Sequence, residues 1–372
     1  MKAIDVRFFN VGHGDSILLE AYDESRRTDA QYIVIDSSMT STKSGLAHPC
    51  VDYLKSRSVK KILALVVTHL HRDHCQGIEQ LLDGSFEIDT TVIPPLFSTK
   101  TKVLEEAFDK CKRDVEEALK GTDSESLRSQ YRSIAWFLAY LAKNEESLMA
   151  RQGPMNVLPF LQSTGATLYA CLPLRRTKGT LYTHMTRGGL FCEETMQTMN
   201  DMSIALLIDF HGNRCLLTGD APAAQWRTHR HEMRAEPSGA LKCRFLKSPH
   251  HGSEHDNEPF FFDYARTPNQ DEPSYCFVSG KGGAKQPHAS TLKTAAANGF
   301  SPRCTNLADA CFVHVPQMLS NLRRLPEEAR PFVLHYGISG PNIPCQGSMI
   351  LTLKEDGTHS VSSETNRPCV YS

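Results

Sequence analysis

The chain has 372 residues, with 41 Lys and Arg side chains against 42 Asp and Glu and a formal net charge of -1. This balance excludes a uniformly basic nucleic-acid coat and an acidic disordered tail, although it allows a local basic groove. Apolar residues make up 40% and charged residues 22%, which is typical of a globular protein that can bury a sizeable core.

Alternation of apolar and polar residues predicts a strand hairpin within the first 20 residues, turning near Gly12 and Gly14. Short helices are expected over 51–59 and 78–82. Further strands are expected over 32–35, 62–67, 91–94, 167–172, 203–209, 214–217, 245–247, 276–279 and 347–353. Strands that alternate with helices in this way predict a layered α/β fold.

The spacing of apolar residues changes between residues 101 and 150. Apolar residues recur there at three- and four-residue spacing on both sides of Gly121, which predicts two helices, the second capped by Thr122 or Ser124. We interpret 101–150 as a helical hairpin inserted on the domain surface. It is either a plain structural pair, a substrate cover or a partner contact.

The strongest chemical signal is the sequence HLHRDH at residues 69–74, directly after the apolar strand predicted over 62–67. Ionisable groups clustered at the end of a buried strand are costly unless something compensates for their desolvation. Imidazole and carboxylate groups are suitable ligands for Zn or Mn. One short loop could therefore supply ligands to two metal ions.

Three further segments place candidate ligands beside strands or loops. LLTGD ends with Asp220, the sequence KSPHHGS at 247–253 contains His250 and His251, and His288 precedes a predicted helix. Each of these segments is a weak signal by itself. Because strand ends meet at one edge in layered α/β folds, we expect these side chains to approach the HLHRDH loop.

Together these segments resemble the metallo-β-lactamase fold superfamily, and within it the hydrolase domain of ComEC-like competence proteins and their free-standing relatives. The likeness covers about 1–100, 200–295 and a closing strand near 347–357, and is carried by NVGHGDS at 10–16, Asp36, HLHRDH at 69–74, NDMS at 200–203, LLTGD at 216–220 and HHGS at 250–253. It implies an αββα sandwich, in which helices flank two mixed β-sheets. The whole of 1–372 would form one domain, with insertions at 101–150 and 300–345.

The resemblance implies two divalent ions, Zn or Mn. It places His69 and His71 on the first ion, Asp73, His74 and His250 on the second, and Asp220 between the two. His250 is favoured over His251 as the ligand, and Asp36 is expected to orient His69 or His71 through a hydrogen bond.

One departure from the superfamily pattern concerns the first ion. Its usual third histidine is missing, and Asn200 and Asp201 stand at that place. Either Asp201 or water would complete this site, or it would prefer Mn.

The resemblance implies a phosphodiesterase or nuclease that cleaves DNA with a metal-activated water. Asp73 would act through its metal, and His251 or His288 would supply the proton to the leaving oxygen. Phosphate contacts are expected from Arg175, Arg176, Lys178 and Lys247. Free-standing relatives resemble effector subunits of bacterial antiviral defence systems, which implies an ATPase or protease partner.

Two other readings stay open at this point. The first is a hydrolase of a small phosphoester or thioester, with a deep pocket closed by the 101–150 insertion. The second is a non-catalytic scaffold that keeps the fold.

The location of the protein is expected from simpler features. No apolar run reaches the ~18 residues of a membrane span, and the N-terminus lacks the apolar segment of a signal peptide. The 12 cysteines are scattered without a CxxC pair, as in proteins with reduced, buried thiols. These features predict a cytoplasmic protein without a membrane partner.

Overall fold

The computed structural model describes residues 1–42, 45–94, 102–121, 125–143, 148–150, 155–156, 165–174, 184, 187–190, 193–233, 241–267, 273–280, 286–308, 311, 345–365, 369 and 371. The structural statements below concern these residues. Within them, no helix is both long enough and apolar enough to cross a bilayer.

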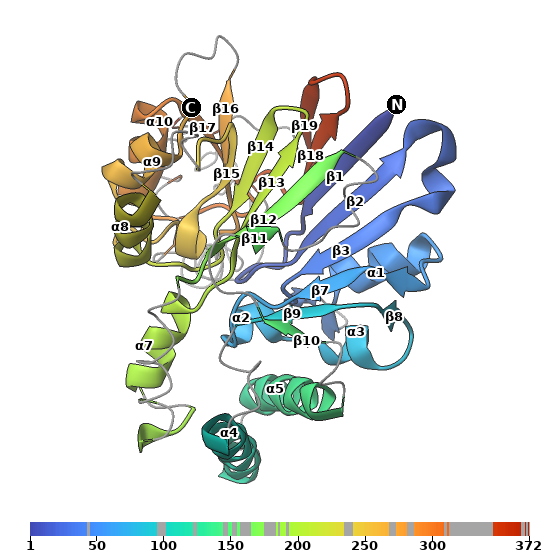
Figure 1. Cartoon of the computed structure of the whole chain (residues 1–372), viewed down its shortest axis with the longest axis vertical. Coiled ribbons are helices and arrows are strands. Elements are labelled where there is room, and N and C mark those ends of the chain that lie inside the picture. Colours follow the sequence, from blue (N-terminus) through green and yellow to red (C-terminus); the bar gives the residue numbers. More distant parts are fainter. Residues whose placement is uncertain are drawn as a thin grey trace, which may run out of the picture.

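Two mixed β-sheets form the centre of the molecule (Figure 1). In the described residues the first has the order β10-β9-β7-β3-β2-β1-β18-β19, with β1 (Lys2–Phe8), β2 (Ile17–Asp23), β3 (Gln31–Ile35), β7 (Ala64–Val66), β9 (Thr91–Ile93), β10 (Leu148–Ala150), β18 (Met349–Lys354) and β19 (His359–Ser363). The second has the order β11-β12-β13-β14-β15-β16-β17, with β11 (Met155–Asn156), β12 (Ala166–Leu172), β13 (Ala205–Phe210), β14 (Asn213–Leu217), β15 (Phe245–Lys247), β16 (Ser274–Val278) and β17 (Phe300–Cys304). Two small sheets pair β4 (Thr40–Thr42) with β5 (Gly45–Ala47), and β6 (Lys61–Ile62) with β8 (Glu87–Ile88).

Helices cover the outer faces of both sheets (Figure 1). Beside the first sheet lie α1 (Pro49–Ser56), α2 (Arg72–Cys75), α3 (Glu79–Leu82), α4 (Lys102–Gly121) and α5 (Glu125–Lys143). Beside the second lie α8 (Ala223–Glu232), α9 (Pro259–Ala265) and α10 (Ala289–Ala297), while α7 (Glu193–Asp201) leads into β13. The 3-10 turns η1 (Glu24–Asp29) and η6 (Pro249–Gly252) complete the described elements used below.

Three apolar cores lie between these layers and pack them together. The central core packs the two sheets face to face and includes Phe8 of β1 stacked on Phe277 of β16, with ring centroids 4.6 Å apart. A second core joins the first sheet to its helices, and the third packs Trp226 of α8 against the second sheet. The arrangement helix–sheet–sheet–helix confirms the predicted fold class.

Alternation along β1 explains how one strand serves two layers. Ile4, Val6 and Phe8 enter the core between the sheets, whereas Asp5 and Arg7 point to the opposite face. The period of two that predicted this strand therefore also assigns its faces.

The structure changes some of the predicted boundaries. The run expected as one strand over 62–67 is divided at Leu63, because β6 pairs with β8 whereas β7 pairs with β3 and β9. Two helices, α4 and α5, occupy most of 101–150 and pack on one another. Most of the second insertion expected over 300–345 lies outside the described residues.

A buried charge network lies on the helix-facing side of β1 and β2. Glu20 is fully buried and accepts hydrogen bonds from Tyr53 (2.6 Å), Arg27 (3.2 Å) and Arg7 (3.3 Å). Both arginines also donate to Asp5. Burial alone would raise the pKa of Glu20. The hydrogen bonds from Tyr53 and Arg27, together with the positive charges of Arg27 and Arg7, lower this pKa below the ordinary value of 4.5.

We predict that Glu20→Gln lowers the free energy of unfolding at neutral pH by about 3 kcal/mol, because Arg7, Arg27 and Arg57 lose a buried counter-ion. A carboxylate with a lowered folded pKa stabilises the fold above its unfolded pKa, and this stabilisation is lost as the pH falls through the folded value. The difference between the variant and the wild type should therefore shrink in acid below pH 4.5. Urea unfolding of both proteins at neutral pH and below pH 4.5 measures this difference.

The exposed Glu87, at 72% side-chain exposure, gives the matched control. Glu87→Gln should change the free energy of unfolding by less than about 0.5 kcal/mol. Equal effects of the two substitutions would contradict the role given to the Glu20 network.

Candidate metal centre

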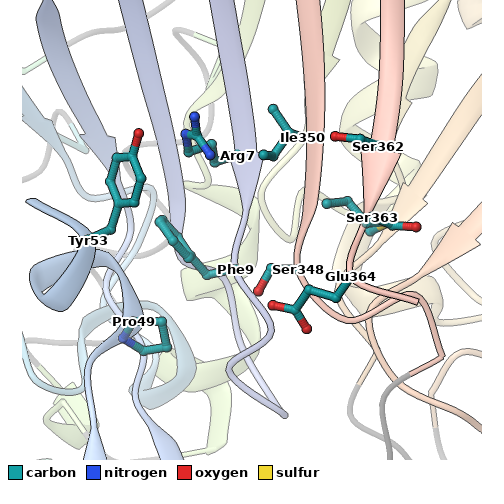
Figure 2. Close-up of a pocket in the computed structure, with 10 residues that line it drawn as sticks. Arg7, Phe9, Pro49, Tyr53, Ser348, Ile350, Ser362, Ser363 and Glu364 are labelled. Carbon is teal, nitrogen blue, oxygen red and sulfur yellow. The ribbon is translucent and has the colours of Figure 1, made fainter. Parts of the chain in front are cut away.

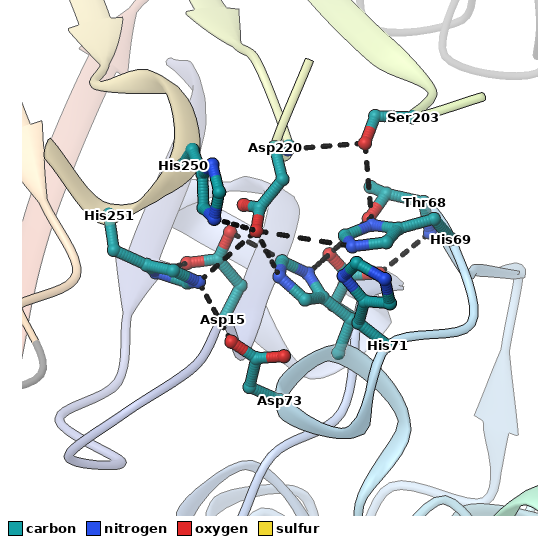
Figure 3. Close-up of polar contacts among 12 residues, drawn as sticks. Asp15, Thr68, His69, His71, Asp73, Ser203, Asp220, His250 and His251 are labelled. Carbon is teal, nitrogen blue, oxygen red and sulfur yellow. Dashed lines mark hydrogen bonds and ion pairs between the residues drawn. The ribbon is translucent and has the colours of Figure 1, made fainter. Parts of the chain in front are cut away.

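Strand ends from both sheets converge on one cluster of histidines and aspartates (Figure 3). From the first sheet, β3 leads to Asp36 and β7 leads to the loop 67–71 and the short helix α2. From the second, β14 leads to Asp220, and β15 leads to η6 with its two histidines. The site therefore depends on the packing of one sheet against the other.

The loop between β1 and β2 closes over the same place. Asp15 N donates to Asp73 O at 2.9 Å. Gly14 makes this approach feasible, since its φ is +127° and a Cβ atom there would lie 2.3 Å from Asp73 O. No other residue type would fit without moving the loop.

Asp220 is the shared element of the cluster. Its Oδ2 atom faces the Nε2 atoms of four imidazoles, at 3.2 Å (His74), 3.5 Å (His251), 3.8 Å (His250) and 3.9 Å (His69). The carboxylate is 1% exposed.

The candidate ligand atoms of the described residues form three groups, two of which share Asp220, while the third, Asp15, Asp36 and His74, lies on the side of His74 Nδ1. Asp73, His74, Asp220 and His251 offer ligand atoms within 4.8 Å of one another, and so do His69, His71 and Asp220. This is the arrangement expected of a carboxylate that lies between two cation sites.

Hydrogen bonds on the far ring nitrogens fix which nitrogen each histidine offers. His74 Nδ1 donates to Asp36 Oδ2 at 2.7 Å, and His251 Nδ1 donates to Ser279 O at 3.1 Å. Both rings therefore present Nε2 to the cluster. His71 is turned the other way, because its Nε2 bonds Met196 O at 2.8 Å and leaves Nδ1 for a ligand role.

His69 is held by two hydroxyl groups. Its Nδ1 lies 3.1 Å from Thr68 Oγ1 and 3.4 Å from Ser203 Oγ. Thr68 in turn donates through its backbone N and its hydroxyl to the two oxygens of Asp36, each at 2.7 Å. One buried carboxylate thus orders both His69 and His74.

Buried polar atoms without hydrogen-bond partners indicate, independently of any family, that the cluster fits a divalent cation. His69 Nε2 and Asp220 Oδ1 are buried and have no hydrogen-bond partner in the described residues. Buried polar atoms are nearly always paired, so these unpaired imidazole and carboxylate atoms need another partner. Imidazole and carboxylate are the donors that Zn and Mn accept.

The charges of the cluster reinforce each other. Burial would raise the pKa of Asp220, but the imidazoles of His251 and His74 hold it well below its ordinary value. Burial would lower the pKa of His251, yet Asp220 and the hydrogen bond with Asp73 raise it to about 10. Without a cation the carboxylates thus pair with protonated His74 and His251, whereas burial lowers the pKa of His69 well below its ordinary value.

This geometry adds detail to two of the sequence-based assignments. Asp36 was expected to orient His69 or His71; it reaches His69 through Thr68 and also bonds His74 directly. His251 belongs to the group with Asp73 and His74, whereas His250 approaches Asp220, and the choice of ligand between them stays a prediction.

The two adjacent histidines separate because both have left-handed backbones, with φ of 44° at His250 and 53° at His251. The His251 ring is buried in the cluster. His250 is 30% exposed, and its Nδ1 donates to Asp256 Oδ2 at 2.7 Å. Its Nε2 atom still points toward Asp220 (Figure 3).

Other predicted residues lie at the border of the cluster. Asp201 accepts a hydrogen bond from Gln225 of α8, and burial raises its pKa. Asn200 Oδ1 is buried without a hydrogen-bond partner in the described residues, and Asp201 belongs to none of their His/Asp ligand groups. His288 is 30% exposed and pairs with Glu254 at 3.4 Å.

The predicted phosphate contacts divide into two cases. Lys247 is 1% exposed and forms an ion pair with Asp15 at 2.7 Å, so the prediction that it grips phosphate is wrong. Arg175, Arg176 and Lys178 lie outside the described residues.

Several side chains of the centre were not found from sequence. Ser203 and Asp256 orient histidines, and His13 Nε2 lies 3.0 Å from Asp73 Oδ2 at the exposed rim. Serine and aspartate are too common for a pattern to single them out. The NVGHGDS segment was a signal for His13 and Asp15, because its glycines predicted a tight turn near the strand ends.

Comparison with known proteins agrees with this geometry. A family model described as the Metallo-beta-lactamase superfamily matches residues 10–86, the segment that contains Asp15, Asp36 and the HLHRDH loop. No curated protein matches the chain.

Two similar solved structures are a mutant of the CmlA beta-hydroxylase and CmlA, a diiron beta-hydroxylase from Streptomyces venezuelae. The first has 10% identity and a TM-score of 0.36, and the second has 11% and 0.30. The matches cover 82% and 73% of this chain, and 52% and 38% of the CmlA chains. The chain therefore spans about half the length of the first of them.

Fold and site together define a class of protein. The chain is a mixed α/β protein consistent with the metallo-β-lactamase fold, and it carries a His/Asp cluster of the kind that binds metal at its sheet edge. The segment from residue 10 to 86 is the part that the superfamily model recognises.

We predict that the purified protein binds two Zn or Mn ions per chain, one for each ligand group that contains Asp220. Asp220→Ala should lose both ions, because both groups share this carboxylate. His251→Ala should retain one, and His250→Ala should retain two. Elemental analysis after dialysis against each metal measures the stoichiometry.

The wild type and an exposed-lysine variant, Lys61→Ala, serve as controls for protein quality. A greater loss of metal in His250→Ala than in His251→Ala would support the assignment of His250 as the ligand. Absence of metal from the wild type after reloading would rule out the metal centre.

Proposed function

We propose that the protein is a metal-dependent phosphodiesterase whose preferred substrate is DNA. The observation that carries this proposal is the buried Asp220 carboxylate shared by two ligand groups. A pair of adjacent cations suits a phosphodiester, since divalent metals neutralise a phosphoryl oxygen and lower the pKa of a water molecule when they are bound.

The chain's own residues would then position the substrate. Among the imidazoles of the cluster, those of His13 and His250 are partly exposed, at 36% and 30%. Asp256 fixes the His250 ring, with its Nε2 toward Asp220. The rings of His250 and His13 would therefore border a bound phosphoryl group, while the buried His69, His74 and His251 would hold the metals.

The preference for DNA rests on the ComEC-like resemblance of the sequence. Arg175, Arg176 and Lys178 remain the proposed phosphate contacts. His288 is retained as a candidate proton donor for the leaving oxygen; it lies beside the site, with its backbone N bonded to Gly252 O.

The small-ester hypothesis expects a deep pocket closed by α4 and α5. A groove of about 450 Å³ crosses the outer face of the first sheet, where Arg7, Ile350 and Ser362 lie side by side on β1, β18 and β19, and Tyr53 of α1 forms its far wall (Figure 2). None of its lining residues comes from α4, α5 or the His/Asp cluster. This groove therefore gives the small-ester hypothesis no support.

The defence-complex hypothesis requires a docking surface for an ATPase or protease partner. Trp136 of α5 is 51% exposed, although Phe137 and Leu138 beside it are buried in the core. Exposed tryptophans are frequent anchors at protein interfaces, which supports the proposal that the helical pair contacts a partner.

We predict Mn- or Zn-dependent cleavage of DNA and a slower reaction with a chromogenic phosphodiester. Asp73→Ala and Asp220→Ala should each lower kcat by more than about 100-fold, since even an outer hydrogen-bond partner of a metal ligand is worth 10–100-fold. Gel assays with DNA and RNA, with EDTA as the control, measure the activity.

Three outcomes separate the alternatives. Rapid hydrolysis of a small ester with no action on nucleic acid would replace the nuclease by a small-ester hydrolase. Metal-loaded protein that is inactive on every substrate would favour the scaffold. Activity only after a partner is added would support a gated effector.

We predict that cleavage of DNA falls as salt rises, because each neutralised phosphate releases counter-ions. The triple charge reversal Arg175→Glu, Arg176→Glu and Lys178→Glu should weaken DNA cleavage. The slope of log affinity against log salt should drop by about 0.9 for each lost contact. Hydrolysis of the chromogenic ester is the internal control and should not change; an equal loss on both substrates would show that these residues support the fold instead.

A further inference from the structure

Lys247 is the most unusual charged group of the second sheet. It is the last residue of the three-residue strand β15, which has a neighbouring strand on each side, and it is 1% exposed. Its ammonium group lies 2.7 Å from Asp15 Oδ2, and it donates to Gly219 O and Ser248 O, each at 3.2 Å. The ammonium thus donates two hydrogen bonds and forms one ion pair.

Each acceptor belongs to a different part of the metal centre. Gly219 directly precedes Asp220, Ser248 begins the turn that carries His251, and Asp15 lies in the loop that closes over Asp73. Two of these parts come from the second sheet and one from the first. A single side chain therefore joins all three.

Asp15 extends this link to the histidines. Its Oδ1 lies 3.7 Å from His251 Nδ1, and its Oδ2 lies 3.9 Å from His74 Nδ1. The carboxylate thus lies behind both rings, on the side away from Asp220, and its backbone N bonds Asp73 O. Four residues that form one ligand group, Asp73, His74, Asp220 and His251, border the Asp15–Lys247 pair.

The pair is poorly explained by stability alone. Buried ion pairs are often no more stabilising than well-packed apolar residues of similar size, because both charges lose their hydration. A side chain that links three ligand-bearing loops is better explained by the geometry that it imposes.

We propose that Asp15 and Lys247 are a positioning pair, which sets the spacing of the group Asp73, His74, Asp220 and His251 and thereby its affinity for a cation. This inference rests on the metal centre of the proposed function, but not on the identity of the substrate. Lys247 offers no metal ligand, and Asp15 lies outside the group whose spacing it would set, although it forms a separate candidate group with Asp36 and His74.

The test compares Lys247→Met with the apolar double variant Asp15→Leu/Lys247→Met. Lys242→Met is the matched control, because Lys242 lies on the same segment but its ammonium donates to Asp263 O at an exposed place. For each protein, three quantities are measured: the melting temperature without metal, the affinity for two equivalents of Zn by competition with a chelating dye, and kcat and KM on the chromogenic phosphodiester.

We expect Lys247→Met to leave Asp15 unpaired and to lower the melting temperature. The double variant should regain most of the melting temperature, because it removes both buried charges. Its affinity for the second Zn should remain lower than that of the wild type by about 10–100-fold, the usual effect of losing a group that orients metal ligands. In the double variant kcat should fall and KM should change little, since the substrate does not contact the pair.

Wild-type affinity for both ions in the double variant would overturn the proposal, and so would equal losses in Lys242→Met. If Lys247→Met does not fold, the double variant still decides the question. A wild-type protein that binds two ions but cleaves no phosphodiester would refute the proposed function and leave the positioning role standing. Failure of the wild type to bind metal would refute both.

Discussion

The arrangement of the molecule depends on one buried carboxylate. Asp220 is 1% exposed and is faced by the Nε2 atoms of His69, His74, His250 and His251. A carboxylate without compensation would not stay ionised at such depth. The imidazoles around it, and the cations that they could hold, supply that compensation. The two sheets must therefore pack in one register, because His69 and His74 follow a strand of the first sheet and Asp220 follows a strand of the second.

Backbone conformation directs the side chains into this arrangement. Asp36, His250 and His251 have positive φ values of 59°, 44° and 53°, a conformation that non-glycine residues seldom adopt. Such conformations persist where surrounding contacts outweigh their cost, and they are frequent at functional sites. Here they turn Asp36 toward His74 and separate the rings of His250 and His251.

Two buried groups of charged residues serve the structure differently. The Glu20 network lies on the outer face of β1 and β2 and joins α1 to the sheet through Tyr53. The Asp15–Lys247 ion pair lies at the sheet edge and connects the first sheet to the second. The former is explained by packing of a helix on a sheet, whereas the latter borders the candidate ligands. Burial of a charge thus marks the functional region only where its partners belong to the ligand loops.

The sequence by itself determined the α/β class, most of the strands and the HLHRDH loop, because period-two alternation and clustered ligand types are local properties. Only the tertiary structure distinguishes the surroundings of His250 and His251, since these depend on two backbone angles and on Asp256 and Ser279 from other elements. The tertiary structure also shows that Lys247 is buried. The sequence predicted a phosphate contact at this lysine, yet the packing of the two sheets encloses its ammonium group beside Asp15. Local pattern records residue type and period, while burial and partner are set by contacts between distant segments.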